Sequence, residues 1–226
     1  MRKVLTLLAI TLLFGACNDS KSLIENEWKV YTSTMEIGDV STAIVSLNRI
    51  IALEKYNGDA LDTLAILYLN AGSNNAALKV GKRALNIRES DALIQVQAKA
   101  NKNLGKYEEA LPYFSKLLAK NPEDLELMYE VAFVNINLGK GNEALPLIQK
   151  IIAHPNSGSA VMQEYYQNGS QLLPYKAVAF NMLGFMQTQV GQNEDALQSY
   201  RTALKIFPKY ALAQNNLNVL MSKMEK

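Results

Sequence analysis

Residues 177–210 read AVAFNMLGFMQTQVGQNEDALQSYRTALKIFPKY, and the spacing of small residues in this stretch decides the fold. Its landmarks are Gly191, Ala196 five residues later, the pair Ala203-Leu204, and Pro208 near the end. A glycine lets the chain reverse without steric cost, and an alanine lets two helices approach closely. The stretch therefore predicts two short helices joined by a tight turn.

The same landmarks recur along the chain. Each of five glycines is followed five residues later by an alanine: the glycines are Gly38, Gly72, Gly105, Gly139 and Gly191, and the alanines are Ala43, Ala77, Ala110, Ala144 and Ala196. Successive glycines are 34, 33, 34 and 52 residues apart, the last step being one 34-residue period plus an 18-residue insert. Between landmarks, apolar residues such as Leu61, Leu64 and Tyr68 recur at helical spacing. The period predicts helical hairpins, each of which must stack on its neighbours to bury its apolar side.

The copy of the repeat that best matches a known pattern has its landmarks over residues 180–208. Phe180, Leu183-Gly184, Gly191, Ala196, Tyr200, Ala203-Leu204 and Pro208 resemble the pattern of the tetratricopeptide repeat family, and the resemblance extends over residues 24–210. It implies an all-α fold, a right-handed superhelical α-solenoid of about five hairpins plus a C-terminal capping helix. The implied repeats are 24–57, 58–90, 91–124, 125–158 and 177–210, with an insert at 159–176 and the cap at 211–226.

Composition disfavours several other functions. The chain has one His and one Cys, which leaves no internal disulfide and no thiolate or multi-histidine metal site. His154 stands in a turn-like His-Pro-Asn string, where a structural role is expected. Arg2 and Lys3 account for the formal charge of +2, so residues 17–226 are neutral and nucleic-acid binding is not expected. No motif for catalysis, a cofactor or a metal is found, and the sequence predicts a non-enzyme.

The first 16 residues predict an export signal. Met1-Arg2-Lys3 is a basic start, and the apolar run from Val4 to Phe14 spans only about 16 Å as a helix, too little to cross a bilayer. Residues 13–17 (LFGAC) resemble the lipobox of bacterial lipoproteins. The resemblance implies removal of residues 1–16, a lipid on Cys17, a tether over residues 17–23 and an address in the cell envelope, with the outer membrane favoured. An ordinary secretory signal is the alternative.

In the tetratricopeptide repeat family the first helix of each hairpin lines a concave groove. Carried onto this sequence, that implies a peptide-binding surface with apolar and aromatic members and two lysines for a ligand carboxylate. These residues are Trp28, Met35, Ile66, Leu69, Tyr129, Phe133 and Phe185, with Lys99 and Lys102. Aromatic side chains in such a groove are suited to an apolar or amphipathic peptide. The alternative is that several of them only pack between neighbouring hairpins.

The insert at residues 159–176 interrupts the period. Residues 159–166 are expected to extend the preceding helix, and residues 168–170 (NGS) to form a turn before the next hairpin. Tyr165-Tyr166 and Leu172-Leu173 are candidate contacts with a partner, because inserts in repeat arrays often lie on a binding face. A connector that packs on the fifth hairpin explains the same residues equally well.

Together these patterns predict a lipid-anchored adaptor that binds a protein or peptide segment in its groove. A self-associating structural protein of the envelope, forming a homo-oligomer, is the alternative.

Overall fold

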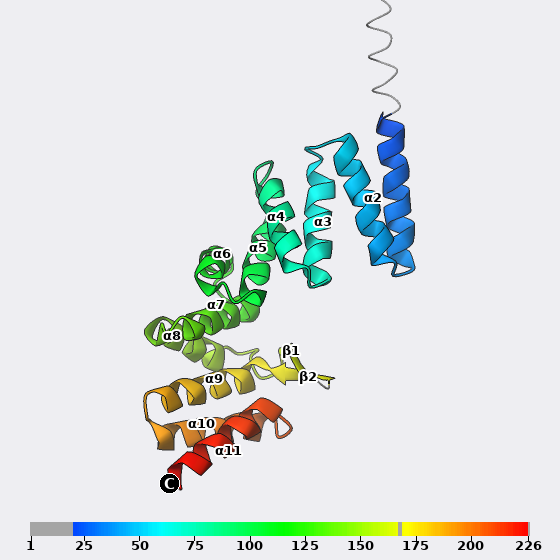
Figure 1. Cartoon of the computed structure of the whole chain (residues 1–226). Coiled ribbons are helices and arrows are strands. Elements are labelled where there is room, and N and C mark those ends of the chain that lie inside the picture. The colour runs from blue at the N-terminus through cyan, green and yellow to red at the C-terminus, as the bar shows by residue number, and fades with distance from the viewer. Residues whose placement is uncertain (1–19, 167–168, 226) are drawn as a thin grey trace, which may run out of the picture. The chain divides into compact units, whose positions relative to one another are not determined.

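The computed structural model describes residues 20–166 and 169–225. The contacts of the chain divide it into two compact units, residues 1–104 and residues 105–226. The predicted signal peptide, residues 1–16, and the predicted lipidation site, Cys17, lie outside the described residues. Figure 1 shows that the described chain is built from helices, with one pair of strands.

The first unit is a stack of antiparallel helices. It begins with a helix over residues 20–36, followed by four elements: α2 (Val40–Leu53), α3 (Gly58–Asn70), α4 (Asn74–Leu85) and α5 (Asp91–Asn103). Consecutive helices pack on each other, and α3 also contacts α5, the next helix but one. Residues 20–23 belong to the first helix, so the prediction of a tether over residues 17–23 is wrong for its described part. The apolar residues Leu23 and Ile24 continue the helical spacing, and neither Gly nor Pro interrupts it.

Local side-chain contacts begin and align the helices of the first unit. Asp39, Asn57 and Ser90 are N-caps whose side-chain oxygens accept hydrogen bonds from backbone N–H groups three residues later. The hydrogen bonds from Thr42 lower the pKa of Asp39. Arg88 follows α4 and binds two carboxylates of α3, those of Asp59 at 2.6 Å and Asp62 at 2.7 Å. These contacts raise the pKa of Arg88 and tie the α4–α5 connection to α3.

The turn within each hairpin depends on a glycine in the left-handed region. The repeat glycines Gly38, Gly72, Gly105, Gly139 and Gly191 have φ values between 70° and 77°. At Gly72, the next residue donates its N–H to the carbonyl of Tyr68, five residues earlier, at 2.8 Å, which closes the Schellman turn of a helix end. The paired alanines Ala43, Ala77, Ala110, Ala144 and Ala196 are all 0% exposed.

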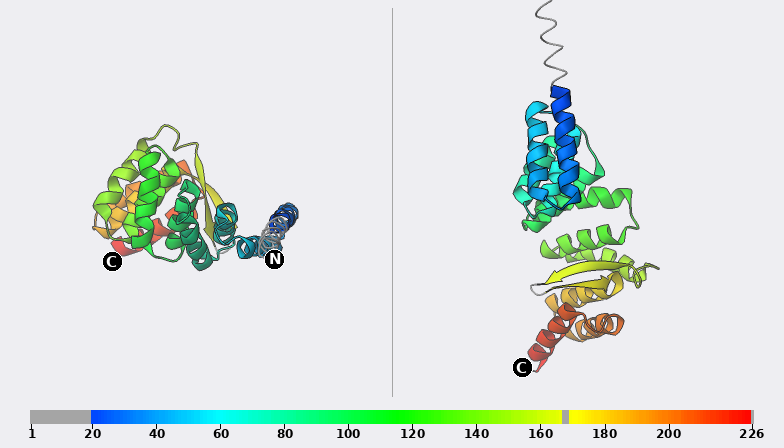
Figure 2. Two further views of the ribbon diagram at one scale, coloured as in Figure 1. Left: turned by 90° about the horizontal axis from the view of Figure 1, so that it is seen from above. Right: turned by 90° about the vertical axis from the view of Figure 1, so that its right-hand side faces the viewer.

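The second unit is also mainly helical and contains the strands. Its elements are α6 (Tyr107–Lys120), α7 (Leu125–Asn137), α8 (Gly141–Ala153), β1 (Val161–Tyr166), β2 (Gly169–Pro174), α9 (Tyr175–Gln189), α10 (Asn193–Ile206) and α11 (Ala211–Met224). Helix α9 is central, because it packs on α7, α8, α10, α11 and β2. The core gathers around Met128, Ile148, Ala177 and Val178. In Figure 2 the hairpin of β1 and β2 lies beside α9.

The insert forms an antiparallel β-hairpin, so the prediction that residues 159–166 extend the preceding helix is wrong. Strand β1 pairs with β2 from Val161↔Pro174 to Tyr166↔Gly169. Helix α8 ends at Ala153 because Pro155 favours extended backbone at His154, whose φ and ψ are −64° and 131°. The His154 ring accepts a hydrogen bond from the N–H of Asn156 at 3.2 Å, a turn contact.

Candidate peptide-binding groove

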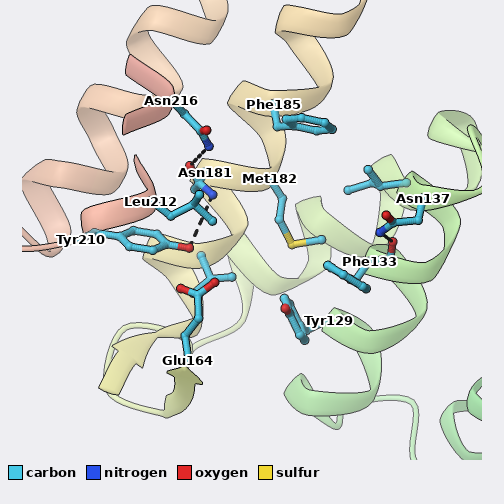
Figure 3. A pocket seen from close by; sticks show the side chains of 12 residues that line it. Tyr129, Phe133, Asn137, Glu164, Asn181, Met182, Phe185, Tyr210, Leu212 and Asn216 are labelled. Carbon is cyan, nitrogen blue, oxygen red and sulfur yellow. Dashed lines mark hydrogen bonds between the residues drawn. The ribbon is translucent and has the colours of Figure 1, made fainter. Parts of the chain in front are cut away.

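One face each of α7, α9 and α11 forms a pocket in the second unit. On α7 the residues Tyr129, Phe133 and Ile136 are spaced four and three apart, and so lie on one side of the helix. On α9 the residues Val178, Met182 and Phe185 repeat this spacing. The pocket has a volume of ≈ 240 Å³, and its other lining residues are Asn137, Glu164, Asn181, Tyr210, Leu212 and Asn216. Figure 3 shows these side chains around the cavity.

The wall from α7 is aromatic. The rings of Tyr129 and Phe133 lie 6.0 Å apart, and Phe133 also meets Tyr107 of α6 edge to face at 6.2 Å. Tyr129 in turn contacts Tyr175 at the start of α9, with a ring separation of 6.5 Å. These contacts hold Tyr129 and Phe133 in place, and on the α9 side Phe185 is 40% exposed.

The side-chain amides of Asn181 and Asn216 fix the opposite wall. Asn181 of α9 is 4% exposed and accepts a hydrogen bond from the amide of Asn216 of α11 at 2.9 Å. Its own amide group donates to the hydroxyl oxygen of Tyr210 at 3.5 Å. Since α9 and α11 are joined through these side chains, the pocket is preformed between them. Asn137 uses its amide to bond the carbonyl of Phe133 within its own helix at 2.8 Å.

A second hollow lies next to the pocket along α9. This hollow shares Ile136 and Phe185 with the first, and it is also lined by Gly139, Gly141, Met186, Gln189 and Val190. Val190 is 71% exposed. We call the two hollows together the α7–α9 groove.

Three carboxylates lie near Tyr175 at the start of α9. Tyr175, 8% exposed, lies beside the aromatic wall. Burial raises its pKa to about 12, and the nearby carboxylates of Glu126, Asp124 and Glu130 add to the shift. A charged phenolate is thus disfavoured here both by desolvation and by like charge.

This pKa makes a prediction about alkaline stability. The pKa of Tyr175 is about 12 in the folded protein, above the ordinary value of 10.0. The neutral phenol therefore stabilises the fold fully below pH 10, and this contribution is lost as the pH rises through 12. The free energy of unfolding is therefore expected to fall less steeply between pH 10 and pH 12 in Tyr175→Phe than in the wild type. Urea unfolding at stepped pH values measures both slopes, and equal slopes would contradict the assignment.

Three of the predicted groove residues lie together. Tyr129, Phe133 and Phe185 line the α7–α9 groove. The predicted residues of the first unit behave differently: Trp28, Met35, Ile66 and Leu69 are half-buried and pack against the apolar core of that unit. Trp28 also meets Tyr31 edge to face at 5.4 Å and borders a shallow hollow with Thr32 and Glu36. Tyr129 and Phe133 are half-buried against the core of the second unit in the same way, so the binding role of these four side chains stays a prediction.

Two groups of residues differ between the prediction and the pocket: the predicted lysines, and pocket residues that were not predicted. Lys99 and Lys102 lie on α5 in the first unit, and their role as ligands of a carboxylate stays a prediction. Tyr210, Leu212 and Asn216 are not among the predicted site residues, because residues 211–226 are expected only to cap the stack. Glu164 is not among them either, because the first part of the insert is expected to be helical. The spacing of Leu212 and Asn216, four residues apart, is the signal that places both on one helix face.

Within residues 20–166 and 169–225, His, Cys, Asp and Glu form no group of three or more that is placed to hold a metal ion. In the same part of the chain, every helix is too short or too polar to span a bilayer.

Comparisons with known proteins agree with this architecture. Two family models described as tetratricopeptide repeat match residues 104–161 and 177–210. The solved structure of YrrB, described as a tetratricopeptide repeat protein with an unusual peptide-binding site, has a TM-score of 0.67 at 19% identity and covers 82% of this chain and 87% of that one. MamA from Desulfovibrio magneticus RS-1 has a TM-score of 0.67 at 15% identity, covering 84% and 97%. At such identities the likeness shows the fold alone, and it confirms the predicted α-solenoid class.

Curated relatives match a short segment of the chain. Protein O-mannosyl-transferase TMTC1 of Mus musculus is 41% identical over 63 residues, which make up 27% of this chain and 7% of that protein. The chain therefore spans a small fraction of the length of this relative. Such a match shows related repeats and does not extend to the transferase activity.

Proposed function

We propose that this chain, which is built from tetratricopeptide repeats, is a non-catalytic adaptor that binds a segment of a partner protein in the α7–α9 groove. The fold is one that typically serves as a scaffold for protein interactions. The observation that carries the proposal is the set of aromatic side chains, Tyr129, Phe133 and Phe185, around a preformed pocket. Large aromatic side chains in a pocket are the usual anchors of protein binding.

The geometry is suited to a peptide rather than a small polar ligand. The groove follows α9 from Val178 to Val190, a distance of about 18 Å at 1.5 Å per residue. That length accommodates about five or six residues of extended chain, or three turns of helix. A pocket of ≈ 240 Å³ between Phe133 and Met182 accepts one large apolar side chain of such a segment. The peptide-binding site in the description of YrrB supports a similar use of this fold here.

Removal of the aromatic anchors tests the proposal. Phe133→Ala and Phe185→Ala are each expected to weaken binding of a co-purifying partner by about 2 kcal/mol, or roughly 30-fold in Kd. Tyr56→Ala is the matched control, because Tyr56 is 70% exposed in the first unit and is expected to leave Kd unchanged. Calorimetric titration measures each Kd, and circular dichroism checks that the variants are folded. Full binding by both groove variants would contradict the assignment.

We further propose that the adaptor is held at a membrane of the bacterial envelope, with the outer membrane favoured, by a lipid on Cys17. The support is the lipobox-like string at residues 13–17 after a short apolar run. Two or three acyl chains, at about 0.8 kcal/mol per buried CH₂, are enough for stable anchoring.

The anchor makes a separate prediction. Cys17→Ser is expected to move the protein from the membrane fraction to the soluble fraction, because it removes the thiol that would carry the lipid. Ser22→Ala is the control and is expected to stay in the membrane fraction. Fractionation of cells followed by immunoblotting measures the distribution. A Cys17→Ser protein that remained in the membrane after a carbonate wash would refute the lipid anchor.

A further inference from the structure

Four exposed apolar side chains of the first unit lie at one of its edges. Tyr56 in the α2–α3 connection is 70% exposed, and Leu53 at the end of α2 is exposed beside it. Ile87 in the α4–α5 connection and Leu23 in the first turn of the first helix are exposed as well. Single apolar side chains on a surface are ordinary, whereas a cluster of them marks a contact with a protein or a membrane. We call these four residues the apolar edge.

The first helix and α2 place Leu23 and Leu53 at the same end of their hairpin. The two helices are joined by the turn at Gly38 and run antiparallel, as Figure 1 shows. Glu27 of the first helix pairs with Arg49 of α2 at 3.2 Å. Leu23 lies one turn before this ion pair and Leu53 lies one turn after it, so both reach the same end.

The α4–α5 connection lies beside the α2–α3 connection at this edge. Arg83 in the last turn of α4 donates a hydrogen bond to the carbonyl of Lys55 at 3.4 Å. A Cβ atom at Gly58, the first residue of α3, would lie 3.8 Å from Cγ2 of Ile87. The ammonium group of Lys55 lies 5.5 Å from the centre of the Tyr56 ring. The edge thus pairs an aromatic ring with a lysine, and both kinds of side chain are favoured where a membrane meets water.

The chain that precedes the described residues leads to this same edge. The described chain begins at Ser20, in the turn that carries Leu23. Ser20 is three residues after Cys17, and a chain of that length spans at most about 11 Å. A lipid on Cys17 would therefore keep the start of the first helix within about 11 Å of a bilayer. The exposed Ile37 lies at the opposite end of this helix, about 25 Å further away at 1.5 Å per residue.

We propose that the apolar edge rests on the bilayer, with Leu53, Tyr56 and Ile87 at the boundary between the lipid headgroups and the acyl chains. This inference rests on the proposed lipid anchor and goes beyond it, because it assigns the surface of the protein that faces the membrane. Apolar side chains gain free energy when lipid removes them from water. The anchor supplies a high local concentration, so a patch too small to bind vesicles by itself is sufficient.

Fluorescent labels on single cysteines test the assignment. Cys17 is the only cysteine of the chain, and a lipid on its sulfur prevents reaction with a maleimide, so an introduced cysteine alone takes the label. Tyr56→Cys and Ile87→Cys place an environment-sensitive probe at the apolar edge. Ile37→Cys is the matched control, because Ile37 is 80% exposed at the opposite end of the first helix. Each full chain, purified with its lipid, is incorporated into phospholipid vesicles with and without a nitroxide-labelled lipid.

The nitroxide lipid quenches only probes that reach the bilayer. It is expected to lower the emission at positions 56 and 87 at least about 3-fold and the emission at position 37 by less than about 1.2-fold, since the control probe is held away from the lipid. Adding Leu53→Ser to Ile87→Cys is expected to weaken the quenching about 2-fold, because apolar area leaves the contact. Val45→Ser is the control for that change, since Val45 is exposed on the same helix two turns before Leu53.

The outcomes separate this inference from the anchor on which it rests. Wild-type protein that reacts with the maleimide and stays in the soluble fraction would overturn both. Membrane-bound, unreactive wild type with equal quenching at positions 37, 56 and 87 would overturn the inference alone. A blue-shifted probe at position 56 that the nitroxide lipid leaves unquenched would also overturn it, because a protein surface would then cover the edge. Tyr56→Ala remains a control for peptide binding, since Tyr56 lines neither hollow of the α7–α9 groove.

Discussion

Tyr200→Ala is expected to lower the free energy of unfolding by about 3–5 kcal/mol. Tyr200 of α10 is 2% exposed and packs with Ala196, Leu217 and Leu220, so its ring joins α10 to α11. On the α9 side its ring lies against Gly184. Truncation removes the apolar contacts and leaves a cavity among three helices, since rigid elements on every side prevent the site from closing.

The matched control keeps the ring. Tyr200→Phe loses only the hydroxyl contact with Thr188, at 3.3 Å, and is expected to cost less than about 1.5 kcal/mol. Urea unfolding monitored by circular dichroism measures both variants, and amide exchange of α10 shows whether the loss is local to the second unit. A cost below about 1 kcal/mol for Tyr200→Ala would mean that the ring is not an element of the core.

The second large effect is expected for Gly184→Val, about 3 kcal/mol of destabilisation. A Cβ atom at Gly184 would lie 2.8 Å from two ring carbons of Tyr200, closer than side chains approach in real structures. The ring has little room to move away, because Ala196, Leu217 and Leu220 pack with it. Valine adds two methyl groups at this point, so α9 and α10 must separate.

A double-mutant cycle ties this effect to its cause. In the Tyr200→Ala background the space beside Gly184 is vacant, so Gly184→Val should cost much less there than in the wild type. Gly158→Val serves as a comparison, since no atom lies within 4 Å of a Cβ built at Gly158, and its cost is expected to stay within about 0.5 kcal/mol. Additive costs for Gly184→Val and Tyr200→Ala would show that the contact does not limit the packing of α9 on α10.

Much of the fold was predictable because its signals are local. The glycine in each hairpin turn takes a backbone conformation that other residues rarely adopt, and the residue after it closes a hydrogen bond to the helix that precedes it, as at Gly72. The N-caps Asn57 and Ser90 bond to N–H groups three residues later. Such features depend on a few neighbouring residues, so a single chain displays them at a regular period.

The candidate site was predictable only in part. Tyr129, Phe133 and Phe185 line a pocket, whereas Ile66 and Leu69, chosen by the same repeat positions, pack on the core of the first unit and line neither hollow of the groove. Position in a repeat specifies the helix face, whereas the exposure of that face depends on which element covers it. The strands were missed because the alternation of β1 covers only six residues, a weak signal. The proline that ends the preceding helix was not weighed against the expected helical extension.

By itself the sequence determined the helical hairpins of this protein, their turns and the small residues at their contacts, because backbone conformation and close packing depend on neighbours along the chain. Only the tertiary structure decided that the insert is a β-hairpin, that Gln171 fastens it to the α10–α11 connection, and that Glu164 enters an aromatic groove. These features arise where segments about 40 residues apart meet, as Gln171 and Ala211 do. Their free energy comes from burial and hydrogen bonds that exist only once the chain is folded.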